Sequence, residues 1–194
     1  GAPAAPAPDT PVPAGSRPRD PHQRWRTGHQ VFFPLVQGIL VGVRCFASAT
    51  LAGDPATALE SLAYATCVMR ASARALEFAA DFAPDNYGSA VRPSMTPPGV
   101  PQALSGLMSA DHHELVASFH EIRPVVAALD GEARAAYEAF VDSVELTYHA
   151  HRYVCARFNG DRVVSLRMNH ASSMSAAEVV DQLGRARVKM LRSS

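Results

Sequence analysis

The chain has 194 residues, of which 47% are hydrophobic, so a wholly disordered protein is excluded and one domain with a substantial core is expected. Lysine plus arginine equal aspartate plus glutamate at 18 each, and the sequence therefore lacks the basic excess of a nucleic-acid-binding protein. The three cysteines, Cys45, Cys67 and Cys155, are odd in number and fall in helical patterns. This usage is unlike a secreted disulfide framework and favours a reducing, cytoplasmic location.

The first 21 residues differ in composition from the rest of the chain. Residues 1–21 hold seven of the 15 prolines, mixed with alanine, which predicts a disordered arm followed by one helical domain over residues 22–194. No apolar segment of the kind found in signal peptides occurs in this arm.

Residues 31–52 form the one membrane-like apolar run. Pro34, Gln37 and Arg44 interrupt it. A centrally placed arginine costs a spanning helix about 2.5–3.5 kcal/mol on insertion scales. We therefore predict a buried helix and no membrane association.

Helix start and stop signals divide the remaining chain into five segments. Asp20-Pro21 and Asp54-Pro55 both place an N-cap residue before a proline at the first helical position. The predicted helices are a first one from residue 21 with a bend at Pro34, then 55–81, 111–129 with a break at Pro124, 130–158 and 175–191. Strand-period alternation is absent, so the predicted class is all-α.

Residues 83–109 interrupt the helical pattern. Prolines at positions 84, 93, 97, 98 and 101 predict a loop without regular structure. Apolar residues recur through it, namely Tyr87, Val91, Met95, Leu104, Leu107 and Met108. A loop of this length in a compact domain is usually functional or disordered, and the apolar residues predict one that is ordered and packed.

Residues 148–157, at the end of the fourth predicted helix, bring two histidines and a cysteine together. Residues four apart share one face of a helix, so His151 and Cys155 point the same way, whereas His149 points elsewhere. A buried cysteine beside a hydrogen-bonded histidine is the commoner explanation of such a pair. A nitrogen ligand and a thiol that approach one cofactor are the alternative.

The motifs that the sequence lacks exclude several classes of reaction. Eight histidines are many for this length, and His29, His112 and His113 lie in or at the start of predicted helices. The sequence contains no HExxH, paired CxxC, CxxCH, GxSxG, Walker or GxGxxG motif. Zinc sites, standard c-type haem attachment, acyl hydrolysis and nucleotide chemistry are therefore not indicated.

Four separated blocks carry a resemblance to a known family. They are Arg24-Trp25 with Gly28-His29-Gln30 and Gln37-Gly38; Tyr87 with Val91-Arg92-Pro93 and Pro97-Pro98; Ser105-Gly106-Leu107 with Asp111-His112; and Tyr148 with His151, Cys155, Phe158, Gly160-Asp161 and Ser165-Leu166. This ordered set resembles the histidine-ligated haem-dependent aromatic oxygenases, the superfamily of tryptophan 2,3-dioxygenase. It is most similar to the bacterial haem-dependent L-tyrosine and 3-methyl-L-tyrosine hydroxylases. The resemblance implies a single helical haem-binding bundle and a homo-oligomer.

The resemblance also implies roles for individual residues. His151 matches the histidine that ligates the haem iron, and Cys155 matches a cysteine that forms a single thioether bond to the haem. His29 and His112 match active-site histidines that handle protons. Arg92 matches an arginine that pairs with the substrate carboxylate. Ser172 and Ser173 are candidate replacements for a Gly/Thr/Ser-rich loop that holds the substrate ammonium, although residues 168–174 contain no glycine and include an unmatched histidine, His170.

The resemblance implies hydroxylation of tyrosine or a tyrosine derivative next to the phenol, giving a catechol in natural-product biosynthesis, with hydrogen peroxide or dioxygen as oxidant. Two other haem proteins remain open: a tryptophan or indole oxygenase, and a sensor that performs no oxidation. A helical interaction domain without cofactor is the alternative of a different class.

Overall fold

The computed structural model describes residues 20–95, 98, 109–159 and 174–193, and this part of the chain is helical without a strand. Its α-helices are α1 (Pro21–Leu51), α2 (Pro55–Ala79), α3 (Ala110–Glu121), α4 (Arg123–Ala127), α5 (Gly131–Asn159) and α6 (Ala176–Arg192). A π-helical turn, η1 (Tyr87–Val91), and a 3₁₀ turn, η2 (Arg92–Met95), follow α2. The predicted all-α class is confirmed. The predicted arm lies almost wholly outside the described residues.

Helices α1, α2 and α6 begin at the predicted residues because side chains satisfy their free N–H groups. The Asp20 carboxylate accepts a hydrogen bond of 3.0 Å from the His22 backbone N–H, and Pro21 occupies the first turn. Asp54 caps α2 in the same way. At α6, Ser175 and Glu178 form a reciprocal capping box. Caps of this kind each stabilise a helix by about 1 kcal/mol.

The two internal prolines act differently. α1 continues as one helix through Pro34, whereas α3 ends at Glu121 and α4 begins at Arg123, directly before Pro124. A proline removes one backbone hydrogen bond, a loss that the long contact of α1 with α2 can offset. The short α3 has no comparably long contact that could offset this loss, and it ends before the proline. The predicted break at Pro124 is confirmed.

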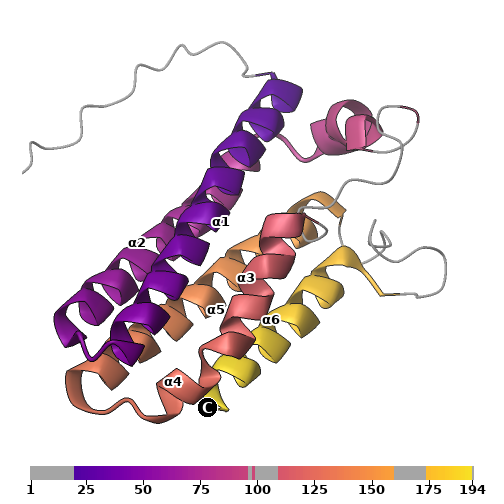
Figure 1. The fold of residues 1–194 in the computed structure, drawn as a ribbon. Coiled ribbons are helices and arrows are strands. Elements are labelled where there is room, and N and C mark those ends of the chain that lie inside the picture. The colour runs from indigo at the N-terminus through magenta and orange to yellow at the C-terminus, as the bar shows by residue number, and fades with distance from the viewer. Residues whose placement is uncertain (1–19, 96–97, 99–108, 160–173, 194) are drawn as a thin grey trace, which may run out of the picture.

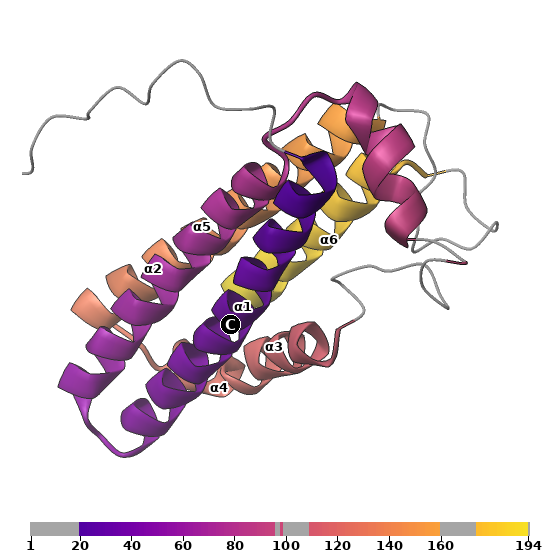
Figure 2. The same cartoon turned by 90° about the horizontal axis from the view of Figure 1, so that it is seen from above.

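Five helices pack in a closed ring. α1 contacts α2, α2 contacts α5, α5 contacts α6, and α3 packs against both α6 and α1. Figure 1 shows α3 lying between α1 and α6, and Figure 2 shows the same bundle from above. Two polar contacts join α3 to α1: Gln37 donates to Asp111 at 3.2 Å, and Arg44 pairs with Glu114.

The interior of one half of the bundle is filled by apolar side chains. Phe46, Tyr137 and Phe140 are fully buried there, together with Ile39, Val43, Leu62, Ile122, Val126, Val141, Val144 and Leu191. The Tyr137 hydroxyl donates a hydrogen bond of 3.0 Å to the Leu191 carbonyl oxygen and so connects α5 to the end of α6.

Replacing Tyr137 with phenylalanine is expected to lower the free energy of unfolding by about 1 kcal/mol, because the buried carbonyl of Leu191 loses this donor. The matched control is Tyr153→Phe, since Tyr153 lies on the same helix and is 58% exposed. Urea unfolding of both variants checks the prediction. Equal stabilities would contradict it.

The prediction that residues 31–52 form a buried helix is correct only for one face of α1. The buried apolar residues of this segment include Val36, Ile39, Val43 and Phe46. Three other apolar residues of α1 are exposed, namely Val31, Val41 and Leu51. In the described part of the chain, α1 is the helix whose length and apolar composition would suffice to cross a membrane, a test that core helices of bundles also pass.

The prediction that residues 83–109 contain no regular structure is wrong for residues 87–95, which form η1 and η2. Prolines 84 and 93 flank η1 instead of interrupting it. The prediction that this segment is packed is confirmed for Tyr87, Val91 and Met95, which form a second apolar cluster with Phe82, Trp25 and Phe158. Leu104, Leu107 and Met108 lie outside the described residues.

The aromatic rings of this second cluster connect the end of α5 to the start of α1. The Phe158 ring stacks on Tyr87 at 4.7 Å and on Phe82 at 4.8 Å between centroids. Trp25 meets both Tyr87 and Phe158 edge-on. The Arg157 guanidinium adds a hydrogen bond of 3.2 Å to the Phe82 carbonyl oxygen. The cluster therefore holds η1 against the end of the bundle at which α1 begins and α5 ends.

Candidate functional site

A cavity of about 100 Å³, partly open to solvent, lies inside the ring of helices. α1, α2, α3 and α5 form its walls. Its histidines are His29, His112 and His151; its other described lining residues are Phe32, Val36, Ile39, Met69, Ser72, Leu76, Leu115, Val116, Phe119, Val144, Thr147 and Tyr148. The structure thus brings together, from three helices, the three histidines that the sequence analysis selected.

Two hydroxyl groups of the cavity wall, those of Ser72 and Thr147, are hydrogen-bonded to the backbone. Ser72 donates to the Val68 carbonyl oxygen at 3.1 Å. The Thr147 hydroxyl lies 2.9 Å from the carbonyl oxygens of both Met69 and Ser143, so it also connects α5 to α2. The other polar groups of the described lining are the three imidazoles and the Tyr148 hydroxyl.

His151 is a buried base that faces the cavity. Burial, and to a lesser extent the nearby His29 and His112, lower its pKa to about 4. The ring is therefore neutral at physiological pH, and its lone pair remains available to a metal ion. Its imidazole makes no hydrogen bond to the described part of the chain, unlike that of His29.

His29 is held in one orientation by its own helix. Its Nδ1 lies 2.9 Å from the Trp25 carbonyl oxygen, and its ring lies 4.4 Å from the Trp25 ring between centroids. A carbonyl oxygen only accepts, so Nδ1 carries the proton of the neutral ring and Nε2 keeps a lone pair. Burial lowers the pKa of His29, and the hydrogen bond to Trp25 opposes that shift in part. His29 thus presents an unprotonated nitrogen at neutral pH.

His112 enters the cavity from the first turn of α3. Its backbone N–H donates a hydrogen bond of 3.2 Å to the Ser109 side chain, which caps the helix. The neighbouring His113 is exposed and does not line the cavity. The helical register therefore places His112 at the cavity and His113 at the surface.

Cys155 lies one turn beyond His151 on α5 and is partly buried. Burial raises the pKa of its thiol to about 11, so the thiol is protonated at physiological pH. Cys155 is not among the described residues that line the cavity. Cys45, Cys67 and Cys155 are all free.

Arg92 also lies outside the described lining. It begins η2, directly after the buried Val91, and that segment packs on Trp25, the neighbour of His29. The predicted substrate-binding residues Ser172 and Ser173 fall outside the described residues.

The sequence analysis missed the wall that α2 contributes. Met69, Ser72 and Leu76 all face the cavity. Their spacing of three and four residues indicates that these side chains share one face of the helix. Ordinary core residues have the same spacing, so the pattern does not identify a cavity wall.

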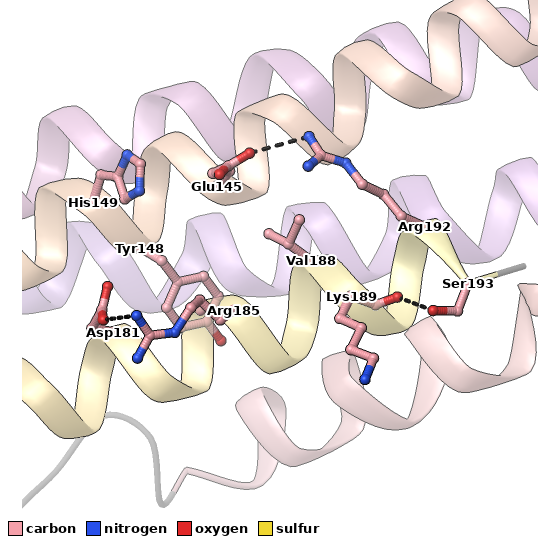
Figure 3. A pocket seen from close by; sticks show the side chains of 10 residues that line it. Glu145, Tyr148, His149, Asp181, Arg185, Val188, Lys189, Arg192 and Ser193 are labelled. Carbon is pink, nitrogen blue, oxygen red and sulfur yellow. Dashed lines mark hydrogen bonds and ion pairs between the residues drawn. The ribbon is translucent and has the colours of Figure 1, made fainter.

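A second concavity, of about 430 Å³, runs along the outside of the bundle between α5 and α6. Figure 3 shows its side chains, which include the ion pair of Arg185 with Asp181 and that of Arg192 with Glu145. Tyr148 lines this outer groove and also lines the inner cavity.

The donor set of the inner cavity fits a haem better than a metal ion bound by protein alone. No group of three or more His, Cys, Asp or Glu in the described residues could hold a metal ion together. A haem brings its own ring ligands and needs one neutral imidazole from the protein, surrounded by an apolar cavity. His151 and the largely apolar lining satisfy both needs.

Comparison with known proteins gives two matches. Residues 1–136, which include His29 and His112, match the family described as SfmD 3-methyl-L-tyrosine peroxygenase. The 3-methyl-L-tyrosine peroxygenase of Streptomyces lavendulae is 32% identical over 191 residues, which is 96% of this chain and 52% of the relative. The chain therefore spans about half the length of the curated relative that it matches. No solved structure gives a significant match.

Proposed function

The chain belongs to the SfmD 3-methyl-L-tyrosine peroxygenase family, and from that premise we propose that it hydroxylates a tyrosine derivative in natural-product biosynthesis. In this reaction one oxygen atom of hydrogen peroxide enters an aromatic C–H bond next to the phenol and gives a catechol, and the other leaves as water. The observation that carries the proposal is the meeting of three imidazoles from α1, α3 and α5 in one largely apolar cavity.

We propose haem as the cofactor, with His151 as its iron ligand and Cys155 as a covalent attachment point. When bound, haem supplies the iron chemistry that activates peroxide. The low pKa of His151 favours ligation, because no proton has to leave the ring at neutral pH. The fold would then be that of a haem-binding bundle similar to tryptophan 2,3-dioxygenase.

His29 and His112 would handle protons in the same cavity. The free Nε2 of His29 is suited to take a proton from peroxide or from the substrate phenol, because its Nδ1 is already committed to Trp25. With two imidazoles in one cavity, one can accept a proton while the other donates one. The apolar lining excludes water and orients the aromatic ring.

The charged end of an amino-acid substrate needs a separate set of groups. Arg92 would pair with its carboxylate, since a guanidinium offers two parallel hydrogen bonds, and Ser172 and Ser173 would accept from its ammonium group.

The test is incubation of the haem-loaded chain with 3-methyl-L-tyrosine and hydrogen peroxide. The proposal predicts a product heavier by one oxygen atom that behaves as a catechol. L-tryptophan in parallel distinguishes a ring-opening or oxindole-forming oxygenase. Rapid binding of carbon monoxide without turnover of either amino acid would instead indicate a haem sensor.

Cys155→Ser is expected to remove the covalent bond to haem while leaving the iron ligand in place. Acid–acetone extraction followed by intact-mass measurement checks this: one haem mass should stay with the wild-type chain and leave the variant. Cys67→Ser is the matched control, because Cys67 is exposed on α2 and is expected to retain the haem mass. Complete extraction of haem from the wild type would contradict the thioether.

A further inference from the structure

Tyr148 lines two separate spaces. It is the residue common to the described linings of the inner cavity and of the outer groove between α5 and α6. The inner cavity has no described lining residue from α6, whereas the groove has several. Figure 3 shows the Tyr148 ring projecting from α5 over α6, beside Asp181 and Arg185.

Gly184 on α6 makes room for Tyr148. A Cβ atom added at Gly184 would lie 2.8 Å from the Tyr148 Cβ and 3.0 Å from its Cγ, closer than such atoms approach in proteins. Gly184 is buried, and its backbone therefore forms the surface on which the base of the Tyr148 side chain packs. The base of the Tyr148 side chain is thus positioned by α6, although Tyr148 also lines a cavity that α6 does not line.

The two spaces differ in chemistry. The inner cavity is lined mainly by apolar side chains, while the groove carries acidic and basic groups, among them Asp181, Arg185 and Lys189. Removing the ring would join them, enlarge the space available beside His151 and admit water to it. An aromatic side chain at such a boundary limits the size of the ligand that fits.

We infer that Tyr148, supported by Gly184, determines which aromatic rings the cavity accepts. The ring excludes bulky substituents and keeps the cavity closed to the charged groove. This inference rests on the proposed function only in placing an aromatic amino acid in the cavity.

The test measures binding of two aromatic hydrocarbons, toluene and tert-butylbenzene, to the purified whole chain by ligand-observed NMR. Hydrocarbons need an apolar cavity and no catalysis, and cavities of this kind bind benzene. Wild type is expected to favour toluene. Tyr148→Ala and the bulkier Tyr148→Leu should shift the affinity ratio toward tert-butylbenzene by about tenfold or more, since each methylene in an apolar pocket is worth roughly 10–200-fold in selectivity.

Two further variants sharpen the experiment. Leu146→Ala is the matched control, because Leu146 lies on the same helix, is 49% exposed and lines neither space. Gly184→Ala should act in the opposite direction and weaken tert-butylbenzene more than toluene, because its Cβ pushes Tyr148 away from α6.

An unchanged affinity ratio in both Tyr148 variants would overturn the inference, as would failure of all variants to bind either hydrocarbon. A uniform loss of affinity for both ligands would mean that Tyr148 only supports the fold. Failure to oxidise 3-methyl-L-tyrosine, with the hydrocarbon selectivity as expected, would count against the proposed function and leave the role of Tyr148 intact.

Discussion

Replacing His151 with alanine is expected to lower the rate of peroxide-dependent hydroxylation by about a thousandfold or more, which corresponds to about 4 kcal/mol of transition-state stabilisation. This loss of rate is expected because His151 is the proposed iron ligand. The other two imidazoles of the cavity, those of His29 and His112, are proposed to transfer protons and lie on other helices, so they cannot replace it. Steady-state turnover of 3-methyl-L-tyrosine, together with haem content per chain, measures both consequences.

His149→Ala is the matched control for this experiment. His149 lies two residues from His151 on α5, is exposed and does not line the inner cavity. Its removal should leave haem content and turnover unchanged. Addition of free imidazole should partly restore His151→Ala, since the deleted side chain leaves a space of that shape. Full activity in His151→Ala, or an equal loss in His149→Ala, would contradict the assignment.

Gly28→Ala is expected to lower the free energy of unfolding by about 2 kcal/mol or more, at the upper end of overpacking effects. A Cβ atom at Gly28 would lie 2.3 Å from the Ala79 Cβ and 2.7 Å from its Cα, so α1 and α2 would have to move apart. The better helix propensity of alanine, about 1 kcal/mol, offsets only part of this cost. Because His29 is the next residue, the same movement should weaken ligand binding in the cavity.

Gly88→Ala provides the comparison, because a Cβ atom at Gly88 would meet nothing within 4 Å. Guanidinium unfolding of both variants tests the claim. The account predicts a clear drop in the midpoint for Gly28→Ala and little change for Gly88→Ala. A Gly28→Ala variant as stable as wild type would show that α1 and α2 tolerate a wider separation than this packing implies.

Helix boundaries were predictable because their causes are local. Asp20, Asp54 and Ser175 cap the helices that they precede, and Pro124 breaks the segment that contains it. Pro34 shows the limit of local reasoning, since the contact of α1 with α2 keeps the helix continuous. The π-helical turn at residues 87–91 also escaped prediction, because Tyr87 and Val91 are fixed by distant rings at Trp25 and Phe158.

The candidate site was predictable in part. The histidines were chosen through a family resemblance, and the helical period correctly separated His151 from the exposed His149. The cavity wall from α2, and the position of Tyr148 in both the cavity and the outer groove, depend on which helices pack together. The spacing of residues along the sequence does not specify that packing. Haem binding, the thioether at Cys155, a homo-oligomer and a cytoplasmic location stay predictions.

The most direct test of the central claim is an absorption spectrum of the whole chain purified after expression with ample haem supply. The account predicts a Soret band from one haem per chain that is absent in His151→Ala and present in His149→Ala. A colourless wild-type protein under those conditions would contradict it.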